Sequence, residues 1–116
     1  MRSIIAISVL LTASAQAQSY DPAKLAADIP HAQKEYKDCL TAKTVELGAG
    51  NTETAETILR GVSAACKSKE DELRALYAQS PIDAAWAESL MIRDRKLGED
   101  AGVAELLQAR ASSSTH

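Results

Sequence analysis

Apolar residues recur at spacings of three and four along most of the chain, a period typical of amphipathic α-helices. A first helix is predicted from Pro30 to about Leu47, preceded by a short helix over 23–28 that Asp21 is placed to cap. Pro30 disfavours helical geometry at the residue before it, so a break is expected there. The apolar stripe of the first helix comprises Ile29, Ala32, Tyr36, Cys39, Leu40 and Leu47.

A second stripe predicts a longer helix, from Asn51 or Thr52 to about Gln79. This is the clearest amphipathic pattern in the chain, and the single Gly61 is not expected to end it. The Gly-rich segment 48–51 predicts a turn, so the two helices should form an antiparallel hairpin. The apolar positions of the second helix are Ala55, Ile58, Leu59, Val62, Ala65, Cys66, Leu73, Leu76 and Tyr77.

A third helix is predicted from Pro81 to about Leu97. Ser80 and Asp83 have the spacing of a capping box, and proline is favoured in the first helical turn. The apolar side of this helix is expected to comprise Ile82, Ala85, Trp86, Leu90 and Leu97.

The segment 98–102 leaves two possibilities, a separate helix over about 102–111 or a continuation of the third helix. Residues 112–116 form a polar tail that is expected to be disordered. No strand pattern is present. The sequence therefore predicts a single all-α domain over 18–111, a disulfide-stapled antiparallel helical hairpin with a C-terminal helix or helix pair.

The first 17 residues have the pattern of a secretory signal peptide. A basic start precedes the apolar run Ile4–Leu11, and Ala15-Gln16-Ala17 matches a cleavage site, with Ala13-Ser14-Ala15 as a second choice. The apolar run is shorter than the roughly 20 residues that span a membrane. Cleavage after Ala17, a periplasmic or secreted location and no transmembrane segment in the mature chain are expected.

Cys39 and Cys66 are the only cysteines, and in an oxidising compartment they are expected to pair. The bridge would close a loop of about 28 residues, for which chain entropy assigns roughly 3.6 kcal/mol. Two free thiols and an intermolecular bridge are the alternatives.

The bridge requires the two cysteines to lie nearly level in the hairpin. On the predicted helix bounds Cys39 lies about eight residues from the turn and Cys66 about fourteen, a mismatch of roughly 9 Å. Bridged Cα atoms must come within about 7 Å. Either the first helix extends towards Gly50, or the turn continues beyond the end of the first helix before the second helix runs back along it.

Composition points to a thin core, because the apolar residues are mostly alanine and leucine and Trp86 is the only tryptophan. The formal net charge of −3 gives no general attraction for nucleic acid. Two interpretations of Trp86 stay open. It can anchor the core, or it can form an interaction surface together with Leu106 and Leu107.

No pattern of catalytic or cofactor-binding residues is present. His31, Glu35 and Asp38 share a helix face, but zinc sites usually need three or four ligands rich in His or Cys. The clusters 70–72 and 93–96 are interpreted as solvated helix faces. Haem-attachment, phosphate-loop and nucleophile motifs are absent. The sequence predicts no catalytic residue, no metal site and no small-molecule cofactor.

These observations predict a small exported helical protein that is not an enzyme and that binds another protein or has a structural role in the envelope. The alternative is a periplasmic stress-protection chaperone, or an inhibitor-type protein that acts on another protein. The layout, an exported helical chain of this size with one disulfide, resembles that of enteric acid-stress chaperones, although no motif is shared. The resemblance implies protection of client proteins at low pH.

Overall fold

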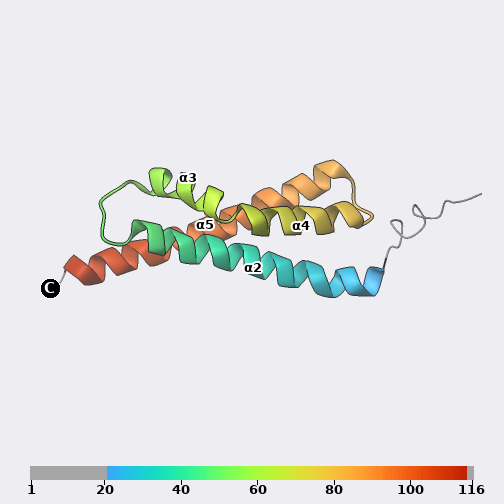
Figure 1. The fold of residues 1–116 in the computed structure, drawn as a ribbon, viewed down its shortest axis with the longest axis horizontal. Helices are drawn as coiled ribbons and strands as arrows, with labels where there is room; N and C mark the ends of the chain where they lie inside the picture. Colours follow the sequence, from blue (N-terminus) through green and yellow to red (C-terminus); the bar gives the residue numbers. More distant parts are fainter. Residues whose placement is uncertain (1–20, 115–116) are drawn as a thin grey trace, which may run out of the picture.

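The computed structural model describes residues 21–114, and these form four helices without a strand (Figure 1). In chain order they are α2 (Pro22–Gly48), α3 (Ala55–Ala65), α4 (Lys67–Gln79) and α5 (Ala84–Ser114). The all-α prediction is confirmed. The predicted signal peptide, residues 1–17, lies outside the described residues.

Helix α2 is a single helix where the sequence predicted two. The side chain of Asp21 caps it, as expected, by accepting a hydrogen bond from the backbone N–H of Lys24 at 3.1 Å. The predicted break at Pro30 is wrong, because the helix continues through this residue. Pro30 is exposed, while Leu25 and Ala32 on either side of it are buried. Packing on both sides therefore holds the helix together across the missing N–H.

The predicted second helix is divided into α3 and α4 at Cys66, whose backbone leaves helical geometry at φ −103° and ψ 13°. Its start also differs from the prediction. Thr54 caps α3 by accepting a hydrogen bond from the N–H three residues on, whereas Asn51 and Thr52 belong to the preceding turn. The break changes the direction of the chain, and both α3 and α4 pack against α2.

Helix α5 runs unbroken through 98–102, so continuation of the third helix is the correct alternative. The predicted capping box does not form. Asp83 alone caps α5, accepting from the N–H of Trp86 at 2.7 Å, while the hydroxyl of Ser80 donates to the Tyr77 carbonyl at the end of α4. Residues 112–114 are helical, which corrects the expected disordered tail over that part.

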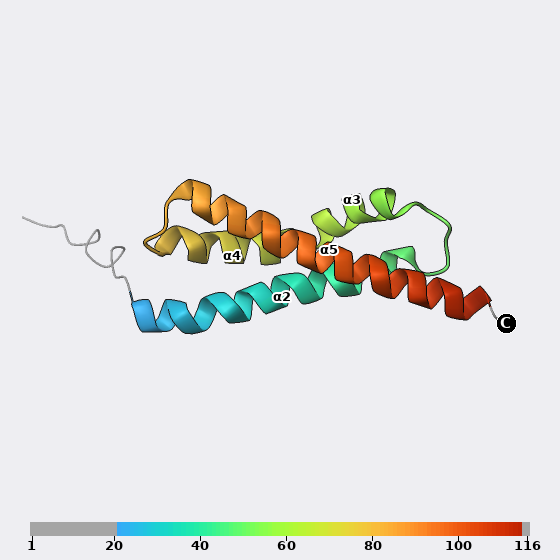
Figure 2. The ribbon, with the colours of Figure 1, turned by 180° about the vertical axis from the view of Figure 1, so that it is seen from behind.

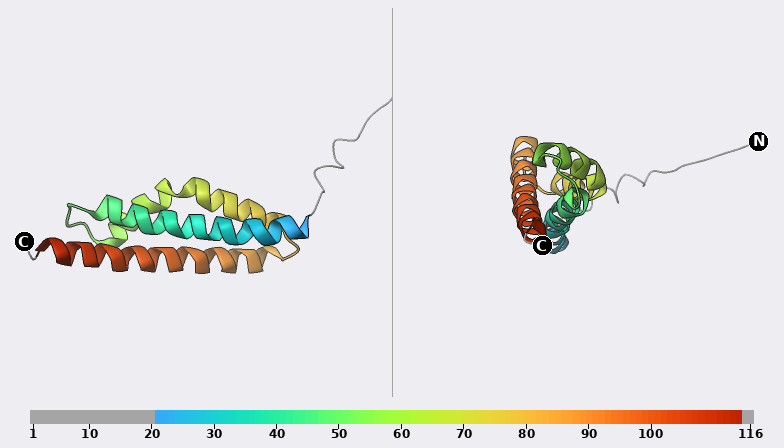
Figure 3. Two further views of the ribbon diagram at one scale, coloured as in Figure 1. Left: turned by 90° about the horizontal axis from the view of Figure 1, so that it is seen from below. Right: turned by 90° about the vertical axis from the view of Figure 1, so that its left-hand side faces the viewer.

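Helix α2 packs against each of the other three helices, and Figure 2 shows α5 running diagonally across the molecule in front of it. Seen from below, α5 forms one edge of the molecule along its whole length (Figure 3, left). The core between the helices is made of long aliphatic and aromatic side chains together with one cysteine. Its main members are Tyr36, Leu40, Ile58, Val62, Cys66, Leu73, Tyr77, Met91 and Leu106.

Two glycines allow α5 to approach α2 closely. A Cβ added at Gly98 would lie 2.8 Å from the Cδ1 of Leu40 and 3.1 Å from the Cα of Lys37. Gly102, one turn on, lies against the fully buried Thr44. At both glycines the backbone of α5 therefore lies directly against α2. A larger residue at either position would not allow the two helices to approach so closely.

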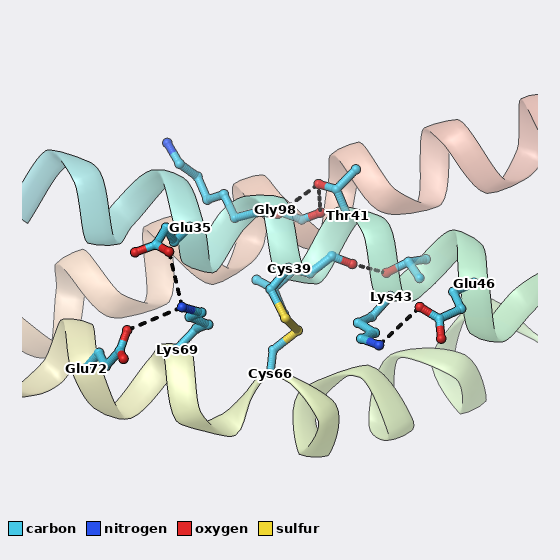
Figure 4. The surroundings of a disulfide bond; sticks show 12 residues. Glu35, Cys39, Thr41, Lys43, Glu46, Cys66, Lys69, Glu72 and Gly98 are labelled. Atoms are coloured by element: carbon cyan, nitrogen blue, oxygen red, sulfur yellow. Dashed lines mark hydrogen bonds and ion pairs between the residues drawn. A yellow bond between two sulfur atoms is a disulfide. The ribbon is translucent and has the colours of Figure 1, made fainter.

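The predicted disulfide between Cys39 and Cys66 is present, with a Cα–Cα distance of 5.9 Å (Figure 4). It joins the middle of α2 to the junction of α3 and α4. The levels match because α2 ends at Gly48, one residue beyond the predicted end, and α3 begins only at Ala55, three or four residues later than predicted. The two cysteines therefore lie level, and an ion pair between Lys69 and Glu35 at 3.1 Å links α4 to α2 beside them.

The turn over 49–54 is held at its ends by side chains. Within the predicted turn, Gly50 takes the left-handed conformation, with φ of 78°. The guanidinium of Arg110 on α5 donates to the carbonyls of Gly48 at 3.3 Å and Glu53 at 3.1 Å. The C-terminal part of α5 thereby fixes both ends of the turn.

Candidate interaction surface

The three residues predicted to form an interaction surface do not lie together. Trp86 is 60% exposed and Leu107 is 58% exposed, whereas Leu106 is 1% exposed. Leu106 belongs to the core, where it lies against Gly48 and fills the space that a Cβ there would need. Its assignment to the surface is therefore corrected, and the interpretation of Trp86 as a core anchor is wrong.

The core-facing side of α5 is formed by residues that a search for apolar stripes passes over. It includes Asp94, Gly98 and Gly102 in addition to Met91 and Leu106. The side that the sequence marked as apolar faces the core only in part. Ile82 and Leu90 pack partly against the core, whereas Trp86 and Leu97 are 60% and 50% exposed. The outward side of α5 thus carries large apolar side chains that the fold does not bury.

These side chains belong to one continuous row along α5, which we call the outer stripe. Its positions are separated alternately by four and three residues, a spacing that keeps them on one side of a helix. The outer stripe comprises Trp86, Leu90, Arg93, Leu97, Asp100, Ala104, Leu107 and Ala111. Ile92, also 50% exposed, lies nearly opposite Leu90 around the helix and outside the stripe. The large exposed apolar members of the outer stripe are Trp86, Leu97 and Leu107. The positions between them include Leu90, which packs partly against the core, and the charged Arg93 and Asp100.

A buried polar cluster ties α5 to α2 and α4. Asp94 is fully buried, and its Oδ2 accepts hydrogen bonds from the Tyr77 hydroxyl at 2.9 Å and from the Gln33 amide at 3.3 Å. Its Oδ1 accepts from Arg93 at 3.1 Å. Burial, and the hydrogen bond to Asp94, raise the pKa of Tyr77 to about 12. Both carboxylate oxygens are partnered, so we interpret the cluster as a structural link between the helices.

The sequence does not single out this cluster, because Asp94 lies within the basic run 93–96, which is typical of a solvated helix face. A signal was present, since Asp94 lies three residues after Met91 and four before Gly98, which places all three on one side of a helix.

The residues considered as metal ligands do not converge. His31 lies 3.2 Å from Glu35, and Glu35 also forms an ion pair with Lys69 of α4. Asp38 forms an ion pair with Lys34 instead. Within residues 21–114, no group of three or more His, Cys, Asp or Glu side chains is arranged to hold a metal ion. Each carboxylate of the run 70–72 forms an ion pair with a lysine or arginine side chain.

Comparison with known proteins found no family model, no curated protein and no solved structure that matches this chain. None of the helices in the described part of the chain combines the length and apolarity needed to cross a membrane.

Proposed function

We propose that this chain is an exported, non-enzymatic protein that binds another protein through the outer stripe of α5. One observation carries the proposal. Trp86, Leu97 and Leu107 expose half or more of their side chains on a helix whose other side already fills the core. Burying one leucine-sized side chain contributes about 1.5–3 kcal/mol, so a partner that covers these three gains substantial free energy. Tryptophan in particular is enriched at the energetic centres of interfaces.

Export is supported by the disulfide, because such bonds persist mainly in oxidising compartments. The proposed location is periplasmic or secreted, with the mature chain beginning at Gln18. The intact mass of the exported protein tests this, after alkylation with and without reduction. We expect a chain that starts at Gln18 and takes alkyl groups only after reduction. Alkylation of the unreduced protein would contradict the proposed location.

A stress-protection chaperone is a second candidate, favoured by ion pairs between helices. Lys69 with Glu35 joins α4 to α2, and Arg74 with Glu88 joins α4 to α5. The side chains of both pairs are 36–52% exposed, so each pair contributes only about 0–1 kcal/mol, and loss of these contacts would widen the apolar surface. Suppression of client aggregation at low pH tests this function. A stoichiometric amount of the protein that leaves aggregation unchanged would exclude it.

The binding proposal is tested by photo-cross-linking in cells that export the protein. A photoreactive residue at Leu97 samples the outer stripe, and one at Ile92 is the matched control, because both side chains are 50% exposed on α5. We expect a discrete cross-linked species from position 97 that position 92 does not give. The same products from both positions, or none from position 97, would contradict the proposal.

A further inference from the structure

An open cavity lies where the turn over 49–54 meets the C-terminal part of α5, at one end of the molecule (Figure 1). Its volume is about 480 Å³, and it is lined by residues 49–52 of the turn and by Leu106, Ala109 and Arg110 of α5. Small-ligand sites typically have volumes of about 300–1,000 Å³ and mostly apolar walls with a few polar groups. This cavity fits that description, because Arg110 is the only charged residue that lines it.

The guanidinium of Arg110 is only partly hydrogen-bonded by the described part of the chain. Of its three nitrogen atoms only Nη2 has acceptors, the carbonyls of Gly48 and Glu53 and the Oδ1 of Asn51. Nε is enclosed without an acceptor, and Nη1, which is not enclosed, also has none among residues 21–114. Buried donors in proteins nearly always have a partner, so the guanidinium retains hydrogen-bonding capacity that its own chain does not use.

The positive charge of Arg110 is also without a counter-charge. Its three acceptors are neutral, and no carboxylate of residues 21–114 forms an ion pair with it. The other arginines of this part of the chain differ, since Arg60, Arg74 and Arg93 each pair with a carboxylate. Arg95 has no acidic partner but is exposed, whereas Arg110 is half-buried. A cation that is partly removed from water is stabilised by an anion beside it.

We propose that this cavity binds a carboxylate that carries a compact apolar group. The carboxylate accepts from Nη1 of Arg110, and the apolar group lies against Leu106 and Ala109. A guanidinium and a carboxylate form strong, charge-assisted hydrogen bonds. One cation balances one negative charge, so a carboxylate suits the site better than a phosphate dianion. The apolar walls favour a ligand that has apolar area to bury.

This inference goes beyond the proposed protein-binding function and depends on no residue of the outer stripe. Leu106, Ala109 and Arg110 lie on a different side of α5 from Leu107 and Ala111. The outcome of cross-linking from position 97 therefore leaves the proposed site untouched, and failure of the site leaves the binding function untouched.

Titration of the isotope-labelled, oxidised chain with phenylacetate tests the site, with the backbone amide resonances as the readout. We expect saturable shifts at residues 49–52 and 106–110. Phenylacetamide has the same shape without the charge, so it should bind at least about tenfold more weakly. Equal binding of acid and amide would overturn the proposal. So would the absence of saturation by about 10 mM, the weakest affinity expected for a ligand of this size.

Inorganic phosphate measures what charge alone contributes. Because phosphate has no apolar group, we expect it to compete poorly with phenylacetate for the cavity. Phosphate that displaces phenylacetate at an equal concentration would overturn the proposal, because the apolar walls would then contribute nothing to recognition.

A pair of matched variants locates the bound acid. Ala109→Leu fills the cavity and leaves Arg110 in place, while Ala101→Leu makes the same change at an exposed position of α5 outside the lining. We expect Ala109→Leu to weaken binding of phenylacetate by at least about tenfold and Ala101→Leu to leave it unchanged. Equal affinities of the two variants would overturn the location.

Arg110→Gln removes the charge directly and should bind phenylacetate as weakly as the wild type binds the amide. A folded Arg110→Gln chain with unchanged affinity would overturn the role of the guanidinium. Since Arg110 also holds the turn, this variant can lose stability, and its urea midpoint measures that loss. The comparison of acid with amide on the wild type, and Ala109→Leu, then decide the proposal without it.

The carboxylate can come from a free organic acid or from the C-terminal residue of a polypeptide. A short peptide that ends in phenylalanine, with its C-terminus either free or amidated, distinguishes these sources. Binding of phenylacetate without binding of either peptide assigns the cavity to a free acid. Tighter binding of the peptide with the free C-terminus, lost on amidation, assigns it to a polypeptide C-terminus. Binding of both peptides alike would overturn recognition of a carboxylate.

Discussion

Gly102 of α5 lies so close to Thr44 of α2 that an added Cβ would be 2.6 Å from the threonine Oγ1 and 2.7 Å from its Cβ. Thr44 is fully buried, and its hydroxyl donates to the Leu40 carbonyl at 2.6 Å. The threonine therefore has no polar atom left without a partner, although it faces the backbone of another helix. Helices α2 and α5 meet here without any room for a side chain on α5.

Gly102→Ala should destabilise the fold. Overpacking a tight contact costs about 1–3 kcal/mol, while alanine recovers about 1 kcal/mol of helix propensity, so we expect a net loss of roughly 1 kcal/mol in the free energy of unfolding. Gly61→Ala is the control, because its added Cβ would meet only the Leu47 side chain, at 3.4 Å. That variant should gain about 0.5–1 kcal/mol. Urea denaturation measures both, and a stabilised Gly102→Ala would show that the contact is loose.

Removing the disulfide should cost about 3.6 kcal/mol on the chain-entropy model. The bridge joins cysteines 27 residues apart, and the Cys39→Ala, Cys66→Ala double variant removes it without leaving a thiol that could pair elsewhere. The urea midpoint of the double variant, compared with that of the oxidised wild type, measures the loss. Equal midpoints for the oxidised wild type and the double variant would show that the bridge adds nothing to stability.

Asp94→Ala should cost at least about 1–3 kcal/mol, because it removes the acceptor of a buried hydrogen-bonded cluster. Asp71→Ala is the control, since Asp71 forms an exposed ion pair with Lys67 and should change stability by less than about 0.5 kcal/mol. Combining Asp94→Ala with Tyr77→Phe completes a double-mutant cycle. We expect the two losses to be less than additive, because both remove the same hydrogen bond. Strict additivity would show that Tyr77 and Asp94 do not interact.

Alkaline pH should weaken the fold through two buried tyrosines. Burial, with the nearby Glu70, raises the pKa of Tyr36 to about 12, and burial with Asp94 raises that of Tyr77 to about 12, from an ordinary value of 10.0. Above about pH 10 the unfolded chain loses phenolic protons that the folded chain keeps. The unfolded state then binds fewer protons, so stability falls as pH rises from about 10 to 12.

Urea midpoints from pH 8 to 12 measure this loss. The variant that carries both Tyr36→Phe and Tyr77→Phe lacks the two buried phenols, so its midpoint should fall less steeply above pH 10. Parallel curves for the wild type and this variant would contradict the prediction.

The hairpin and its disulfide could be predicted from the sequence because strong local signals agreed there. Ile58, Val62 and Leu73 recur at helical spacing, and all three are buried. The break at Cys66 could not be predicted, since neither glycine nor proline marks it. It reflects how α3 and α4 both pack against α2, which is a property of the tertiary fold.

The orientation of α5 about its own axis was predicted wrongly for a related reason. Trp86 and Leu97 are large apolar residues of this helix, so the pattern indicated that they face the core. In this fold the close approach of the helices, and not the size of the apolar side chains, determines which side of α5 faces the core. Gly98 and Gly102 let α2 come near, and Asp94 satisfies buried donors, so these residues face inward. Neither effect is visible in a count of apolar positions.

The position of the disulfide also determines what a single cut in the backbone would do. The turn over 49–54 lies between Cys39 and Cys66, so a protease that cleaves it leaves two fragments joined through sulfur. Arg110 would still hold Gly48 on one side of the cut and Glu53 on the other. Under oxidising conditions the nicked protein gains one water at the cut but stays a single disulfide-linked molecule with its helices, and only reduction releases the fragments.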